Sequence, residues 1–119
     1  MPGKIEWIEF KGREILFNDR SNLSPDNIIR NVNEVKTLIM NSGKRNILYL
    51  IDNSNTSIIP KVKDHIKNAG KELDPYIKKT AVLGASLPQK VLLNLLNKIT
   101  RMSIMVFDNI ENAKEWLIE

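Results

Sequence analysis

The chain has 119 residues, 42% of them hydrophobic and 27% charged, which is typical of one globular domain with a sizeable core. It has no cysteine, which excludes disulfides, zinc-thiolate sites and thiol chemistry. The formal net charge of +4 comes from lysines that are interleaved with acidic residues, and this dispersed pattern argues against a nucleic-acid partner.

Hydropathy excludes a membrane-spanning or exported chain. No apolar run approaches the roughly 20 residues that a transmembrane helix needs. Residues 1–7 lack the apolar core of a signal peptide. We therefore predict a cytoplasmic protein that forms a single domain over residues 1–119.

The N-terminal part of the chain predicts a hairpin. Residues 4–10 and 13–18 are rich in β-forming types and flank a short turn at Lys11-Gly12. Two such segments around a glycine-containing turn are typical of antiparallel strands. We place this hairpin at one side of the sheet.

The first helix has clear start and stop signals. Ser24 is a capping residue and Pro25 occupies the first helical position. Apolar residues then recur every three or four positions as far as Asn41-Ser42-Gly43, where glycine can end a helix in the left-handed conformation. The apolar stripe predicts packing against the sheet.

The central strand is the most strongly indicated element. Residues 47–51 are five consecutive apolar residues that end at Asp52, and such a run indicates a strand buried on both faces. An apolar helical pattern starts at Ile58 and tolerates Pro60 in its first turn. Asp74-Pro75 ends it.

The last third of the chain alternates strand and helix. Gly84-Ala85 ends a strand, and Ser86 with Gln89 has the spacing of a capping box. The helix that follows is the most apolar of the chain. The expected elements are a strand over 77–83, a helix over 87–99, a strand over 103–107 and a helix over 109–117.

This order, β-β-α-β-α-β-α-β-α, predicts an α/β fold with a mixed, mostly parallel sheet. The carboxyl ends of parallel strands lie along one edge, where helix N-termini present free amide donors to anions. A hydroxyl at this edge could also carry a phosphate. The segments expected there are Asp52 to Thr56, Gly84 to Ser86, and Phe107-Asp108.

Each of these residues also has an ordinary structural role. Ser54, Thr56 and Ser57 are typical turn and capping residues, and Asp52 is equally suited to hold a loop by hydrogen bonds. The Gly84 turn lacks the glycine spacing and the Lys-Ser/Thr pair of a phosphate-binding loop.

The sequence indicates no catalytic or metal chemistry. The single histidine, His65, has no second histidine or cysteine with which to form a metal site. An aspartyl phosphoacceptor, as in receiver domains, needs an acidic pair after the first strand and a lysine after the last one. Only Asp19 and Phe107-Asp108 stand at those places. We predict no enzyme, no metal site and no cofactor.

Asp52-Asn53-Ser54-Asn55, following a buried strand, resembles the phosphorylation turn of STAS domains, the SpoIIAA-like class of anti-sigma-factor antagonists. Residues 76–86, 106–108 and 113–117 are similar to a bacterial STAS/SEC14-type subgroup of uncharacterised small proteins. The resemblance extends from about Ile5 to Leu117 and implies a SpoIIAA-like fold.

In the antagonists this turn reads Asp-Ser-Ser/Thr-Gly, and a partner kinase phosphorylates its third residue. The resemblance implies that Ser54 is the matching phosphosite. Asn53 and Asn55 stand where the family has serine and glycine. Asparagine tolerates the left-handed conformation, so this substitution is compatible with the turn.

The resemblance predicts a non-enzymatic regulatory module that binds a protein partner and is switched at Ser54, beside Lys61 and Lys63. The alternative is a carrier of a small anionic or lipidic ligand in a crevice between the Asp52 and Ser86 turns. The residues predicted to form the partner or ligand loop are Asp52, Asn53, Asn55, Thr56, Gly84 and Ser86.

Overall fold

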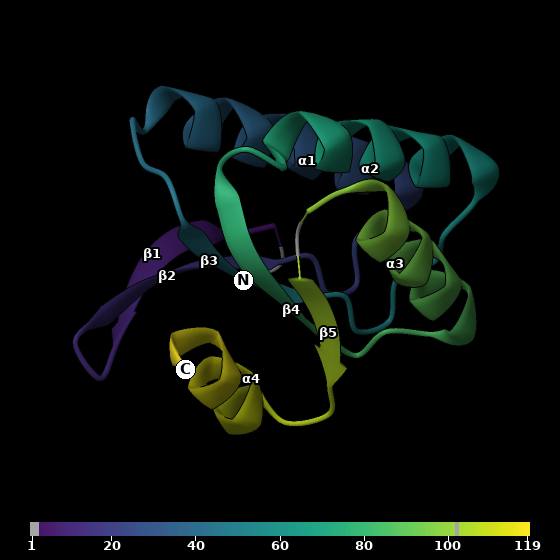
Figure 1. The fold of residues 1–119 in the computed structure, drawn as a ribbon. Helices are drawn as coiled ribbons and strands as arrows, with labels where there is room; N and C mark the ends of the chain where they lie inside the picture. Colours follow the sequence, from purple (N-terminus) through teal and green to yellow (C-terminus); the bar gives the residue numbers. More distant parts are fainter. Residues whose placement is uncertain (1–2, 102) are drawn as a thin grey trace.

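A computed structural model describes residues 3–101 and 103–119 (Figure 1). These residues form a five-stranded sheet in the spatial order β1-β2-β3-β4-β5, with only β1 and β2 antiparallel. The predicted α/β class, element order and mixed, mostly parallel sheet are confirmed. The elements are β1 (Ile5–Phe10), β2 (Arg13–Asp19), α1 (Pro25–Asn41), β3 (Ile47–Asp52), α2 (Pro60–Leu73), β4 (Ile77–Leu83), α3 (Leu87–Ile99), β5 (Ser103–Phe107) and α4 (Ile110–Ile118).

Helices cover both faces of the sheet. In Figure 1, α1 and α2 lie on one side of the strands and α4 lies on the other. Because successive strand residues point to opposite faces, β3 contributes to both cores. Ile47, Tyr49 and Ile51 pack with residues of α1, α2 and α3, whereas Leu48 and Leu50 pack with Ala113 and Leu117 of α4. The prediction of a strand buried on both faces is therefore confirmed.

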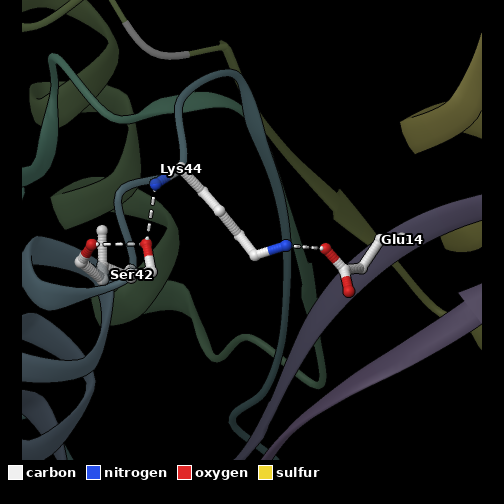
Figure 2. Close-up of polar contacts among 4 residues, drawn as sticks. Glu14, Ser42 and Lys44 are labelled. Carbon is white, nitrogen blue, oxygen red and sulfur yellow. Dashed lines mark hydrogen bonds and ion pairs between the residues drawn. The ribbon is translucent and has the colours of Figure 1, made fainter.

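The end of α1 is tied to the sheet by polar contacts. Ser42 Oγ donates to the carbonyl of Ile39 (2.7 Å), and it accepts from the backbone amide of Lys44 (3.1 Å; Figure 2). The Lys44 ammonium reaches Glu14 of β2 at 2.6 Å (Figure 2) and lies 4.9 Å from the ring centre of Trp7 on β1. These contacts join the loop before β3 to the hairpin.

One helix start differs from the sequence pattern. The apolar pattern begins at Ile58, but α2 begins at Pro60, and Ile59 is an extended N-cap residue (φ −93°, ψ 161°). The proline explains the difference, since its ring disfavours helical dihedrals in the preceding residue. Ile58 and Ile59 therefore belong to the loop that follows β3.

No helix in the described ranges is both long and apolar enough to span a bilayer.

Candidate functional site

A hydrogen-bonded turn of residues 52–55, named here the Ser54 turn, follows β3 directly. The Asp52 carboxylate accepts from the Ser54 amide (3.0 Å) and from the Ser54 hydroxyl (2.7 Å). Asn55 has φ 56°, the left-handed conformation that it was expected to adopt where the family has glycine. Both Asp52 and Ser54 are half-buried. The two hydrogen bonds to Asp52 therefore hold the Ser54 side chain in a fixed orientation within a partly exposed turn.

The Ser54 turn and the Gly84 turn are in contact. This contact was expected, because both turns follow parallel strands and so lie at the carboxyl edge of the sheet. The Asn53 amide donates to the Leu83 carbonyl at 2.9 Å, and Leu83 pairs with Asp52 on one side and with Phe107 on the other. Asp108, in contrast, is exposed.

Gly84 is required by both its conformation and its contacts. Its φ is 69°, and a Cβ at this position would lie 2.8 Å from Ser54 Cα and 2.3 Å from Ser54 Oγ. Ser54 Cα is a backbone atom and cannot rotate away as a side chain can, so a side chain at position 84 would displace the Ser54 turn itself.

Gln89 joins the two turns, a role that the sequence analysis did not assign to it. The predicted capping box is present: the Ser86 hydroxyl accepts from the Gln89 amide, and Gln89 Oε1 accepts from the Ser86 amide. The Nε2 group of Gln89 then donates to Thr56 Oγ1 (2.8 Å) and to the Thr56 carbonyl (3.2 Å). Thr56 in turn donates to the Asn53 carbonyl at 2.7 Å.

A second turn repeats the geometry of the Ser54 turn at the end of β2. In residues 19–22, the Ser21 turn, the Asp19 carboxylate accepts from the Ser21 amide (3.0 Å) and from its hydroxyl (2.5 Å). Asn22 has φ 60°. The sequence analysis missed this turn, although the pattern Asp-X-Ser-Asn stands at both 19–22 and 52–55.

Arg20, the second residue of the Ser21 turn, is buried, with 5% of its surface exposed. Its Nε donates to Asn31 Oδ1 (2.8 Å) and its Nη2 to the Tyr49 hydroxyl (3.2 Å). Asn18 Nδ2 donates to the same two acceptors, at 2.9 and 2.8 Å. Among the described residues Arg20 forms no ion pair. A buried cation without a counter-ion carries a desolvation cost on the order of several kcal/mol.

The sequence held one signal for this polar cluster. Asn31 lies on the apolar face of α1, three residues after Ile28 and four before Val35, and all three side chains are buried. A buried amide needs hydrogen-bond partners. No local pattern around Asn18 or Arg20 predicts that these two residues are the hydrogen-bond partners of Asn31.

Large apolar side chains are exposed at the starts of α2 and α3. Leu87 and Val91 are 78% and 65% exposed, and they lie one helical turn apart at the start of α3. Gln89, which binds Thr56, stands between them in the sequence. Ile59, at the start of α2, is 40% exposed. Exposed apolar groups of this kind mark interaction surfaces.

The remaining candidates contribute no reactive constellation. His65 is half-buried, and its Nε2 lies 2.8 Å from Asn33 Oδ1 of α1. Across residues 3–101 and 103–119, no group of three or more His, Cys, Asp or Glu side chains is placed to hold a metal ion. Asp19 and Asp52 are in register on neighbouring strands, but each carboxylate is engaged by the serine of its own turn.

No protein-family model matches the chain, and no curated protein matches its sequence. The structure is similar to the 2.25 Å crystal structure of an uncharacterized protein of the DUF3478 family with a SpoIIAA-like fold, from Shewanella loihica. The TM-score is 0.74 at 16% sequence identity, and the match covers 96% of this chain and 92% of that chain. The chain therefore has a SpoIIAA-like α/β fold, as the sequence resemblance implied.

Proposed function

We propose that this protein is a non-enzymatic regulatory domain of the cytoplasm that binds a protein partner. The binding surface consists of the Ser54 turn and the first turns of α2 and α3. The observation that carries this proposal is the exposure of Leu87 and Val91 on the first turns of α3, the helix whose Gln89 is hydrogen-bonded to Thr56 directly after the partly exposed Ser54 turn. Burying such side chains against a partner would contribute about 25 cal/mol for each Å² of apolar surface removed from water.

Phosphorylation of Ser54 supplies a switch for this surface. The Ser54 hydroxyl donates to the Asp52 carboxylate, so a phosphate on Ser54 removes that donor and brings about two negative charges next to an existing one. Repulsion favours movement of the phosphate away from Asp52, towards solvent. Lys61 and Lys63 of α2 are exposed, and they are the cations proposed to attract the phosphate.

The alternative function, a carrier with its ligand between the Asp52 and Ser86 turns, receives less support at that position. Gln89 links those turns through its hydrogen bonds to Thr56, and Gly84 is in contact with Ser54. Space between the turns is therefore taken up by the protein itself. A ligand there would have to displace Gln89, which is 2% exposed.

The proposal is tested by affinity capture of the protein from a lysate of its source organism, with intact-mass analysis of the bait. We expect a stoichiometric partner and a bait species heavier by one phosphate that maps to Ser54. A Leu87→Ser/Val91→Ser variant should lose the partner because both side chains belong to the proposed surface.

Ile99→Ser is the matched control, since Ile99 is an exposed apolar residue at the opposite end of the same helix. Equal partner recovery by the double variant and by this control would place the contact elsewhere on the protein. A bait that captures no partner and carries no phosphate would contradict the proposal.

A further inference from the structure

A partly enclosed cavity of about 70 Å³ lies between the sheet and helices α1, α2 and α3. Its walls are mainly apolar, contributed by residues such as Val35, Ile51, Ile66, Leu92 and Leu93. Gly70 of α2 also lines it, and a Cβ there would lie 2.9 Å from Leu96 of α3. The volume exceeds the roughly 10–15 Å³ that a single water requires.

Five polar residues also line this cavity: Arg20, Tyr49, Asn53, Thr80 and Gln89. Tyr49 and Thr80 lie within β3 and β4, Arg20 and Asn53 directly follow β2 and β3, and Gln89 lies in the first turn of α3. Tyr49 and Thr80 are neighbours in register on β3 and β4, and Arg20 donates to the Tyr49 hydroxyl. A positively charged group and a hydroxyl donor therefore converge on an otherwise apolar space.

Among the described residues, one of these polar groups has no hydrogen-bond partner and another uses only part of its donors. Thr80 is 3% exposed, and its Oγ1 has no hydrogen-bond partner among the described residues. Arg20 uses Nε and Nη2, both towards neutral acceptors, whereas a guanidinium carries five N–H donors. Buried polar groups in folded proteins are normally satisfied. Both groups border the same cavity, so a single occupant could satisfy them.

We propose that this cavity binds a small monocarboxylate with a short apolar tail. The carboxylate accepts from the Arg20 guanidinium and from the Thr80 hydroxyl, and the tail lies against the apolar walls. A carboxylate suits a guanidinium because both are planar and pair through two parallel hydrogen bonds.

The single positive charge that borders the cavity favours an occupant with a single negative charge. Arg20 is the one cationic side chain among the cavity-lining residues, so a phosphate dianion would leave one negative charge uncompensated in an apolar space. This site does not depend on the proposed role of Ser54. Asn53 and Gln89 border both this cavity and the crevice between the Asp52 and Ser86 turns, but most of the cavity wall is the sheet and the faces of three helices.

The experiment is an NMR titration of the isotope-labelled full chain with propanoate, whose five non-hydrogen atoms suit a cavity of about 70 Å³. Propan-1-ol is the neutral ligand of the same length, and inorganic phosphate is the compact multivalent anion. We expect saturable shifts at millimolar or lower propanoate for amides of cavity-lining residues, weaker binding of propan-1-ol, and none of phosphate. Equal binding of propan-1-ol and propanoate, or no shifts with propanoate, would overturn the proposal.

Thr80→Val is the most informative variant. It removes the hydroxyl without breaking any hydrogen bond among the described residues, so the fold should be retained. We expect its affinity for propanoate to fall by roughly tenfold or more, the usual effect of losing a hydrogen bond to a charged group. Unchanged affinity would show that Thr80 does not contact the ligand.

Arg20→Met removes the charge and keeps the length of the side chain. We expect it to abolish the preference for propanoate over propan-1-ol. Retention of that preference would overturn the role of Arg20. If this variant failed to fold, the Thr80→Val result and the comparison of propanoate with propan-1-ol would still decide the proposal.

Discussion

The Ser21 turn and the Ser54 turn are nearly identical locally and differ in their surroundings. In each, an aspartate at the end of a strand accepts from the amide and the hydroxyl of a serine two residues later. The turns also contact each other directly, since the Arg20 amide donates to the Asp52 carbonyl and the Asn22 amide to the Ser54 carbonyl, at 2.9 and 3.0 Å.

Their neighbours are different. The Ser21 turn adjoins the hairpin, where the Asp19 amide donates to the Lys4 carbonyl, and its second residue is the buried Arg20. The Ser54 turn adjoins β4 and α3, where Gly84 contacts Ser54 and Gln89 donates to Thr56, and the start of α3 exposes Leu87 and Val91. The Asp-X-Ser-Asn pattern thus specifies a turn, and the neighbouring elements decide what that turn can do.

The greatest loss of stability is expected from disrupting the contact between Gly84 and Ser54, which distinguishes the Ser54 turn from the Ser21 turn. Gly84→Ala introduces both a strained positive φ and a clash with Ser54 backbone, and we expect a loss of about 3 kcal/mol or more in the free energy of unfolding. Gly43→Ala is the control, because Gly43 has φ 71° with open space around it, and it should cost about 1 kcal/mol. Urea unfolding measures both, and equal losses would show that the Gly84–Ser54 contact does not constrain the turn.

The second prediction separates structure from charge near the Ser21 turn. Asn18→Ala removes the buried amide that hydrogen-bonds Asn31 and Tyr49, and we expect a loss of about 2–3 kcal/mol. Arg20→Met leaves those acceptors bonded to Asn18 and removes a buried cation that forms no ion pair within residues 3–101 and 103–119, so stability should stay within about 1 kcal/mol or rise. A larger loss for Arg20→Met than for Asn18→Ala would show that Arg20 is mainly a structural residue.

The smallest effect tests whether the two turns are energetically equivalent. Ser21→Ala and Ser54→Ala each remove one hydroxyl hydrogen bond to a half-buried carboxylate, so each should cost about 1 kcal/mol in chemical denaturation. If the costs of Ser21→Ala and Ser54→Ala differ by more than about 1 kcal/mol, the surroundings of the two turns change their contributions to folding stability.

Local patterns predicted most of the fold. The apolar run that became β3, the Ser86–Gln89 capping box and the glycine at the hairpin turn are each encoded by adjacent residues, and the structure contains all three. The sequence pattern places the start of α2 two residues early, because the apolar period includes Ile58 and Ile59. Pro60 disfavours a helical conformation in the residue before it, so the helix begins at Pro60.

The site was only partly predictable, because its contacts join distant segments. The resemblance and the strand order brought Asp52, Ser54 and Gly84 together in advance. The bond from Gln89 to Thr56 spans 33 residues, and the Arg20 cluster joins β2, α1 and β3. Side-chain pairing over such separations leaves no periodic trace in a single sequence.

A switch at Ser54 is best tested by comparing Ser54→Asp with Ser21→Asp. Both changes place a negative charge at the same position of two matching turns, so any general effect of charge on the fold is shared. With the partner recovered by affinity capture, we expect Ser54→Asp to change partner affinity by roughly tenfold or more and Ser21→Asp to leave it unchanged. Equal effects of the two variants, or no effect of either, would contradict a switch located at Ser54.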